Sequence, residues 1–358
     1  MIQNKWIRRA AFTGVLVLPI LTAGCGLFSQ SASKEIDPPQ TEVPSGLDGQ
    51  KTGQAGVKGE QAGDTQMTVY LQDENGYLAP IAIRTSFGEK EKPGQKALEM
   101  MVDGGAYASQ LPEGFAAVLP QGTQIKGFDI VTDKQENKIA VVDFSSPFTQ
   151  YNLQDERRIV ESITWTLTAM PGIEGVEIWS EGKKLDEMPV GSYPLDEPLT
   201  RAVGINLEAA EGVDYSRSTP VTLYFSAVTA NDEQYYVPVT RLINRTASAS
   251  PAQAALEQLI AGPLATSDLS AVITDDVKIK SIEEKDSTVT VNLEDSSYLE
   301  GQKAPSEMLQ AVVLSLTEVT GAESVQIVLN GKQNIVDSDN KDYSKPVGRP
   351  HHVNELKA

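Results

Sequence analysis

The amino-acid sequence predicts an α+β fold in which one small domain occurs twice in tandem, each copy with two helices packed on a sheet. From Met67 onward, short stretches of sequence recur at an offset that drifts between 149 and 158 residues. Both copies also show the same succession of strand and helix patterns. An offset this long exceeds the repeat of a solenoid and fits a duplicated domain.

The chain divides into six segments on this basis. They are a signal peptide, a lipidated disordered tether, a first domain, a connector, a second domain and a tail, at residues 1–24, 25–66, 67–192, 193–217, 218–350 and 351–358.

The N-terminal segment has the three parts of a secretory signal. Lys5, Arg8 and Arg9 precede an apolar run at 11–21, and the small residues 22–24 follow it. The run is too short to span a membrane comfortably, which favours a cleaved signal. The sequence up to Cys25 resembles the lipobox of bacterial lipoproteins, with Leu-Thr-Ala-Gly before the cysteine and the leucine one place earlier than usual. We therefore expect cleavage between Gly24 and Cys25 and lipidation of Cys25; the alternative is an ordinary signal peptide that happens to contain a cysteine.

Charge and cysteine content exclude several classes of function. The net charge is −19, and it becomes −22 after cleavage because residues 1–24 carry three basic residues and no acidic one. A protein this acidic is repelled by nucleic acid and by anionic lipid headgroups, so the lipid must supply the membrane affinity. Cys25 is the only cysteine, which excludes disulfides, thiolate catalysis and cysteine metal sites downstream.

The tether at 26–66 is rich in Gly, Pro and polar residues. It has too few apolar groups to offset the entropy of ordering, so we expect it to be disordered. A flexible segment of this length has a root-mean-square span of roughly 35 Å, which would let the folded part stand away from the bilayer.

Five strands are predicted in each copy from apolar runs bounded by turn residues. They lie at 67–71, 77–85, 124–131, 138–144 and 175–180, and again at 221–227, 235–242, 277–282, 288–293 and 324–330.

Two amphipathic helices are predicted in each copy from apolar residues at helical spacing. Their apolar faces carry Leu98, Met101 and Val102; Ile159, Ile163, Leu167 and Met170; Leu256, Leu259 and Ile260; and Leu309, Val312, Val313 and Leu316. Ser250, Pro251 and Gln253 predict a capped helix start, and Gly262 before Pro263 predicts its end. Glycines after the longer helices, Gly172 and Gly321, suit helix C-termini.

The two copies share recognisable sequence. The matching stretches are Thr68-Val69-Tyr70-Leu71 with Thr222-Leu223-Tyr224-Phe225, Ala97-Leu98-Glu99 with Ala255-Leu256-Glu257, Leu167-Thr168 with Leu316-Thr317, Gly182-Lys183 with Gly331-Lys332, and, as the exits, Pro189-Val190-Gly191 with Pro346-Val347-Gly348.

With its lipobox, tether and two copies of this unit, the chain resembles the tandem GerMN-domain lipoproteins of bacterial sporulation and spore germination. The resemblance covers essentially all of the chain after the tether. It implies a non-enzymatic protein of the spore envelope, with domains similar to the ring-building domains of secretion and sporulation machines. It further implies protein partners among other envelope and spore-assembly proteins, and a location on the outer face of the cell membrane or the membrane around the developing spore.

The search for chemistry in the sequence gives no catalytic residue, cofactor or metal site. His351 and His352 stand in a polar tail that we expect to be frayed. The loop from Asp337 to Asp342 has alternating oxygen ligands but lacks the glycine and glutamate of a calcium loop, so we expect a solvated acidic loop.

Two weaker candidates keep an alternative open, namely binding or hydrolysis of cell-wall peptidoglycan. Asp143 and Glu161 could form a carboxylate pair, although the second copy has Asn292 and Gln310 in their places. Trp165 and Trp179 could line a sugar site, although core packing is the more usual role for such residues.

The connector contains an apolar patch at 202–205 that is too hydrophobic for a plain linker. We expect it to pack on one of the domains and fix their relative angle.

Overall fold

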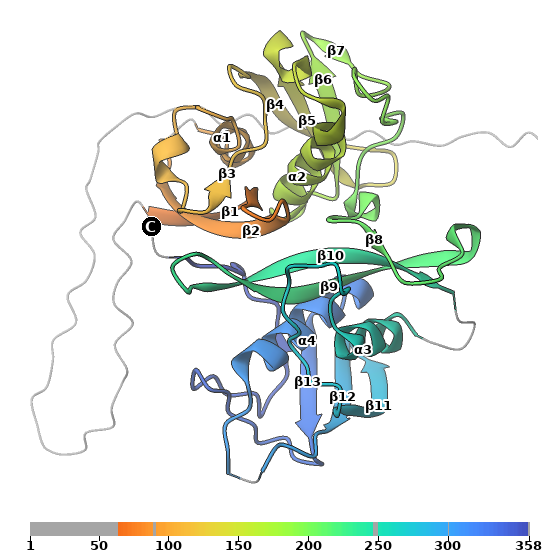
Figure 1. Cartoon of the computed structure of the whole chain (residues 1–358). Helices are drawn as coiled ribbons and strands as arrows, with labels where there is room; N and C mark the ends of the chain where they lie inside the picture. Colours follow the sequence, from red (N-terminus) through yellow and green to blue (C-terminus); the bar gives the residue numbers. More distant parts are fainter. Residues whose placement is uncertain (1–63, 89–90, 246–249, 300, 357–358) are drawn as a thin grey trace, which may run out of the picture. The chain divides into compact units, whose positions relative to one another are not determined.

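The computed structural model describes residues 64–88, 91–245, 250–299 and 301–356 (Figure 1). The signal peptide, the Gly24–Cys25 cleavage site, the lipidation site at Cys25 and the tether up to residue 63 lie outside these residues. The described part contains two copies of one α+β domain, as the repeat predicts.

The first domain has two sheets. The smaller has the order β2-β1-β3, from β1 (Asp64–Asp73), β2 (Leu78–Ser86) and β3 (Phe115–Ala116). The larger has the order β4-β5-β6-β7, from β4 (Ile125–Thr132), β5 (Lys138–Phe144), β6 (Gly175–Ser180) and β7 (Lys183–Lys184). All pairs in both sheets are antiparallel except β5 with β6.

The second domain repeats this plan, except that the third strand of its smaller sheet comes from the connector and pairs in parallel with the second hairpin strand. Its smaller sheet has the order β8-β10-β9, from β8 (Glu208–Ala209), β9 (Ser218–Val228) and β10 (Gln234–Asn244). Its larger sheet has the order β11-β12-β13-β14, from β11 (Lys278–Lys285), β12 (Thr288–Glu294), β13 (Ser324–Leu329) and β14 (Val347–Gly348).

The helices of each copy lie between its two sheets. They are α1 (Pro93–Met100) and α2 (Glu156–Thr168) in the first domain, and α3 (Pro251–Ala261) and α4 (Ser306–Thr320) in the second. Short 3-10 turns occur at Ala108–Gln110, Ser146–Thr149, Leu153–Asp155, Arg201–Val203 and Tyr215–Arg217.

The sandwiched position of the helices explains an unexpected burial pattern. The predicted face of α4 is buried, and so is that of α2 apart from Met170, which lies beyond the helix and is half-buried; residues 311–317 of α4 are buried all round. A helix that touches one sheet buries one stripe, whereas a helix between two layers buries both sides. The predicted α+β class is confirmed, and the separate hairpin sheet is what the sequence did not indicate.

The helix ends follow the predicted chemistry in three of four cases. Ser250 caps α3 by accepting a hydrogen bond from the Gln253 amide, and Gly262 ends it with a positive φ of 78°. Gly321 ends α4 in the left-handed conformation. Gly172 also has a positive φ, but α2 already ends at Thr168, so the prediction that this glycine ends the helix is wrong.

The predicted correspondence of the two exits is also wrong. In the second domain β14 pairs with the start of β13, with Val347 opposite Val325. In the first domain the equivalent bridge joins Leu199, not Val190, to Val176. Residues 198–201 of the first copy are therefore equivalent to residues 346–349 of the second, and they lie inside the stretch assigned to the connector.

The C-terminal tail is an ordered part of the fold, and the prediction of a frayed tail is wrong for residues 351–356. The Asn354 carbonyl accepts a hydrogen bond from the Ala82 amide at 2.8 Å, and the Asn354 side chain is buried. His352 Nδ1 lies 3.2 Å from Thr68 Oγ1. The chain thus leaves the second domain and packs on the hairpin of the first.

Candidate functional site

The two copies meet where strand β2 of the first hairpin lies beside strand β10 of the second. Two asparagine side chains join these strands. Asn206 accepts a hydrogen bond from the Leu78 amide at 2.8 Å and donates to the carbonyls of Leu78 at 2.8 Å and Pro238 at 2.7 Å. Asn206 thus satisfies backbone groups at the facing edges of both hairpins.

Asn354 makes the matching set of contacts. It accepts from the Tyr236 amide at 2.8 Å and donates to the carbonyls of Tyr236 at 2.8 Å and Pro80 at 2.9 Å. Proline has no amide hydrogen, so it suits a strand edge where no ladder bond is made. The carbonyls of Pro80 and Pro238 still need donors, and the asparagine amides supply them.

These contacts are related by an approximate two-fold axis between the copies. Tyr70 is opposite Pro80 in the first hairpin and Tyr224 is opposite Pro238 in the second, so the two prolines are equivalent. Asn206 joins Leu78 of the first copy to Pro238 of the second, and Asn354 makes the reciprocal connection. A two-fold contact uses the same surface of both partners and closes on itself.

A buried polar cluster lies beside this contact. Both oxygens of Glu318 on α4 accept from Arg201 Nη1, at 2.8 and 2.7 Å, and Arg349 Nη2 lies 3.1 Å from the same carboxylate. Tyr224 also donates to Glu318, and Arg349 contacts the Tyr224 hydroxyl. The Glu318 carboxylate therefore pairs with one arginine from each copy, Arg201 after the first domain and Arg349 after the second.

The ionisation of this cluster follows from its burial and its charges. Burial raises the pKa of the Glu318 carboxyl, but Arg201 and Arg349 outweigh this and hold its pKa below the ordinary value. Burial raises the pKa of Tyr224 well above the usual range, so this phenol is neutral and can donate. Two cations and one anion remain in the cluster at neutral pH.

Trp165 and Ile205 belong to a small apolar cluster at the same place. Both are fully buried, together with Tyr70 and Leu78. Trp165 Nε1 donates to the Gly204 carbonyl at 2.7 Å, and the Arg201 guanidinium lies 4.4 Å from the centre of its ring. The expectation that patch 202–205 packs on a domain is confirmed, since Ile205 is buried and also accepts a hydrogen bond from the Thr240 amide of the second domain.

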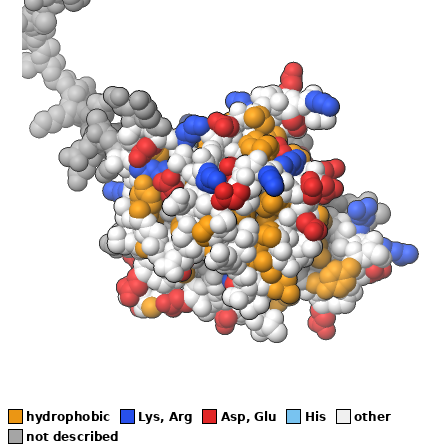
Figure 2. All heavy atoms as spheres, turned by 90° about the horizontal axis from the view of Figure 1, so that it is seen from above, with side chains coloured by type: hydrophobic (Ala, Val, Ile, Leu, Met, Phe, Trp, Pro, Cys, Tyr) orange, Lys and Arg blue, Asp and Glu red, His pale blue; other side chains and the backbone are white. Residues whose placement is uncertain are grey.

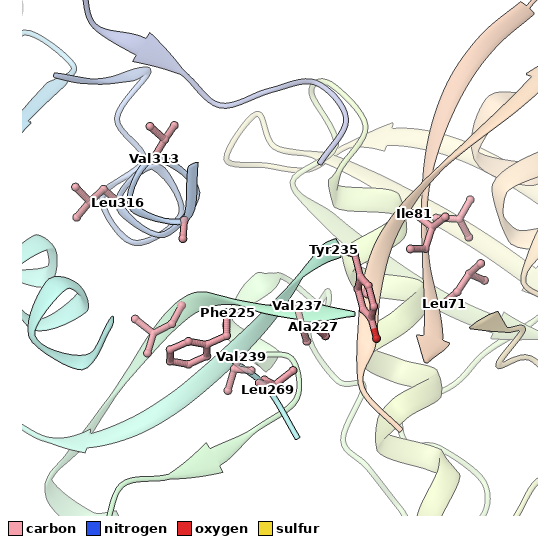
Figure 3. Packing of buried hydrophobic residues seen from close by; sticks show 14 of the residues in the cluster. Leu71, Ile81, Phe225, Ala227, Tyr235, Val237, Val239, Leu269, Val313 and Leu316 are labelled. Carbon is pink, nitrogen blue, oxygen red and sulfur yellow. The ribbon is translucent and has the colours of Figure 1, made fainter. Parts of the chain in front are cut away.

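At the other end of the contact, Tyr235 of β10 reaches the first domain (Figure 3). Its hydroxyl donates to Asp73 at 2.8 Å, and its ring meets Phe115 edge-on with centroids 5.1 Å apart. Burial raises the pKa of Asp73 above its ordinary value, although this hydrogen bond acts in the opposite direction. Apolar and polar contacts thus continue along the whole contact between the copies.

The structure does not join Asp143 and Glu161 into a catalytic pair. Asp143 accepts a hydrogen bond from the Gly182 amide in the β6–β7 turn. Glu161 is buried, pairs with Arg157 at 2.6 Å and accepts from the Asn206 amide. Burial raises the pKa of the Glu161 carboxyl despite the nearby arginine. The two carboxylates serve different structural contacts.

The remaining sequence candidates are also structural in their contacts. Asp337 is buried and accepts from the amides of Asp339 and Lys341, so the solvated-loop prediction is wrong for Asp337, while Asp339 is exposed. Among the described residues, no group of three or more His, Cys, Asp or Glu could hold a metal ion. Trp179 is half-buried on β6, and its indole nitrogen is buried without a hydrogen-bond partner among the described residues.

The interface residues missing from the sequence predictions had a detectable signal. The segments after the two exits read Pro-Leu-Thr-Arg-Ala-Val-Gly-Ile-Asn at 198–206 and Pro-Val-Gly-Arg-Pro-His-His-Val-Asn at 346–354. Proline, arginine, a β-branched residue and asparagine recur at the same spacing. This second repeat lies after the last predicted strand of each copy.

No helix among the described residues is long and apolar enough to cross a membrane.

The family described as "Germane: Sporulation and spore germination" matches residues 68–186 and 222–335. In an alignment of 360 positions that covers 95% of each protein, the chain is 36% identical to the spore germination protein GerM of Bacillus subtilis (strain 168). It is also similar to the solved tandem GerMN domains of the sporulation protein GerM from Bacillus subtilis, with a TM-score of 0.73 and 36% identity over 82% of this chain and all of that one. With both copies matched and the whole domain pair aligned, the chain belongs to the Germane family of sporulation and spore germination proteins, with tandem GerMN domains.

Proposed function

We propose that this protein is a lipid-anchored, non-enzymatic scaffold of the spore envelope, which binds other envelope proteins through its paired GerMN domains during spore formation and germination. Cys25 carries the lipid, and the protein stands on the outer face of the cell membrane, in sporulating cells on the membrane around the developing spore.

The closed contact between the two domains carries this proposal. The asparagines, the Glu318 cluster and Ile205 fasten both copies together through equivalent surfaces. A closed two-fold contact cannot propagate into a ring or filament, so any larger assembly has to use other surfaces. Fastening two domains in this way gives a single body with two sets of outer surfaces, which suits a protein that positions partners.

The chemistry of the described residues gives the enzymatic alternative little support. Trp165 is fully buried with its indole nitrogen on a backbone carbonyl, so it cannot form a sugar platform. Asp143 and Glu161 are held by different elements. A peptidoglycan hydrolase needs convergent carboxylates in an open cleft.

The test compares wild-type protein with the Cys25→Ala variant in sporulating cells, with affinity recovery after mild crosslinking of intact cells. Membrane association lost in the variant, together with recovery of spore-envelope proteins by the wild type alone, is the expected result. Recovery of peptidoglycan fragments alone, to the same extent with both proteins, would instead support wall binding and overturn the scaffold proposal.

A further inference from the structure

The first domain has an apolar groove between the start of β1, the start of α1 and the end of α2. It encloses about 700 Å³. Its apolar lining comes from Met67, Phe87, Phe128, Ile130, Met170 and Pro171. We call these residues the first-domain groove. The chain's two histidines, His351 and His352, also line it.

The second domain has a groove at a similar place, but more charged and polar side chains line it. It lies between the start of β9, the start of α3 and the end of α4. Arg245 lies near the position that Phe87 has in the first groove, and Glu257, Gln258 and Glu318 also line this groove, whereas Val319 stands where the first groove has Met170. The first-domain groove is therefore the more apolar of the two.

Strand β4 borders the first-domain groove and is the terminal strand of its sheet. One edge of β4 thus lacks a strand partner among the described residues, although Lys92 Nζ already bonds the Phe128 carbonyl. Beyond Phe128, Ile130 is 53% exposed and Val131 is 44% exposed. An exposed, apolar strand edge is a template for pairing with another extended chain.

The same edge in the second domain is protected by charge. Phe128 is opposite Val142, which pairs with Ile178, and Ile282 is opposite Val291, which pairs with Ile327. Phe128 and Ile282 are therefore equivalent, so Ile130 and Val131 correspond to Glu284 and Lys285. Charged residues are the usual means of preventing strand addition at an edge, and the first copy lacks them at these two places.

The charges of the groove lining and of the whole chain together favour one class of binding partner. The one acidic residue in its lining, Asp129, is paired with Lys92 at 2.8 Å, so the groove itself has no unpaired negative charge. The chain carries −19, or −22 without residues 1–24, and this net charge attracts basic partners and makes a second copy an unfavourable one.

We propose that the first-domain groove and the free edge of β4 bind an extended apolar segment of a partner protein that is flanked by basic residues. The segment's backbone pairs with β4, and one apolar side chain enters between Phe128, Ile130 and Met170. This inference rests on the proposed scaffold function and assigns its docking surface to one domain.

The test replaces Ile130 in the full-length protein by the photocrosslinking residue p-benzoylphenylalanine and irradiates sporulating cells. Val228 carries the same replacement as a control, because it is an exposed apolar residue of matched accessibility at 52% on the second domain. The expected result is a crosslink from position 130 but not 228, mapped by mass spectrometry to an apolar, base-flanked segment of another protein. A synthetic peptide of that segment should then bind wild-type protein.

The binding step uses the variant Ile130→Glu/Val131→Lys, which copies the charges of the second domain onto a matched strand. It should weaken peptide binding by about tenfold or more, while Val228→Lys should not. A crosslink from position 130 to residues 26–63 of the same chain, or to a second copy, would overturn the proposal. No crosslink from position 130, in cells where the wild type still recovers envelope proteins, would overturn this docking surface while leaving the scaffold function standing.

Discussion

Asn206 and Asn354 occupy equivalent positions in the two copies, and their side-chain amides join the same two strands, β2 and β10, in a reciprocal way. Each donates to a proline carbonyl of one hairpin and satisfies an amide and a carbonyl of a single residue in the other copy. The tandem domains are thus fastened as a two-fold pair and not as beads on a linker.

Removing either asparagine amide should therefore weaken the contact between the domains. Asn354→Ala leaves the buried Pro80 carbonyl and the half-buried amide and carbonyl of Tyr236 without partners, and we expect the free energy of unfolding to fall by about 2–3 kcal/mol. Asn206→Ala should cost a similar amount, because Asn206 is half-buried but its partners belong to Leu78 and Pro238, which are both buried. Denaturant unfolding measures both, with Asn152→Ala, an exposed asparagine, as the control. Equal stability of all three variants would show that the amides contribute nothing to the contact.

Glu318 should be the most sensitive single residue of the contact. Glu318→Gln leaves the half-buried Arg201 and Arg349 without a counter-charge, and because breaking a fully buried ion pair from one side costs about 3–5 kcal/mol, we expect a loss near the lower end, about 3 kcal/mol. The matched control is Glu294→Gln, which breaks the exposed pair with Lys280 and should leave the unfolding midpoint unchanged. Thermal unfolding of the two variants tests this, and similar losses in both would contradict it.

Glu318 should also make stability depend on pH in acid. Its folded pKa lies below its ordinary value of 4.5, so its contribution to stability is present above about pH 4.5 and is lost as pH falls through the folded pKa. Asp73 and Glu161 have raised pKa values and act in the opposite direction, so the informative quantity is the difference between wild type and Glu318→Gln. That difference should shrink as pH falls below 4.5, and a difference that stays constant down to pH 2.5 would refute the assignment.

The connector offers a matched pair of positions for testing how the domains are held together. Ile205 is fully buried, whereas Leu207, two residues along, is 42% exposed. Ile205→Asp places a charge among Tyr70, Leu78 and Trp165, so we expect a loss of more than about 3 kcal/mol and a larger radius of gyration in solution scattering. Leu207→Asp should leave both quantities as in the wild type. An unchanged scattering profile for Ile205→Asp would mean that this residue does not fix the relative angle.

Local sequence patterns were sufficient for the elements within each copy. The strands at 138–144 and 175–180 were predicted with the bounds that the structure has, because turn residues mark both ends of each apolar run. The two-residue strand β8 was not predictable in this way, since its pairing with Arg241 and Leu242 depends on a contact more than thirty residues away. Strand pairing of this kind leaves no local periodicity.

The contact between the copies was hidden for a different reason. Tail residues such as His352 and Asn354 have polar composition, which favours a frayed end when composition alone is considered. Their order comes from backbone groups of Pro80 and Ala82, some 270 residues earlier in the chain. Only the recurring arginine and asparagine after each exit marked them in advance, and that pattern becomes meaningful once the two exits are aligned correctly.

The floor of the first-domain groove gives a last prediction about the difference between the copies. Gly94 is the second residue of α1 and lies against the Phe128 ring, and a Cβ atom at this position would lie 2.1 Å from the nearest ring atom, Cζ. The second copy has Ala252 and Ile282 at the equivalent positions, so there the helix residue is larger and the strand residue is smaller than in the first copy. We expect Gly94→Ala to cost about 1–3 kcal/mol, because the clash exceeds the gain in helix propensity. Adding Phe128→Ile should recover at least about 1 kcal/mol relative to the sum of the single variants, since the smaller side chain makes room for the methyl group. Denaturant unfolding of the two single variants and the double variant completes this cycle. Additive losses would show that the side chains at positions 94 and 128 do not constrain each other.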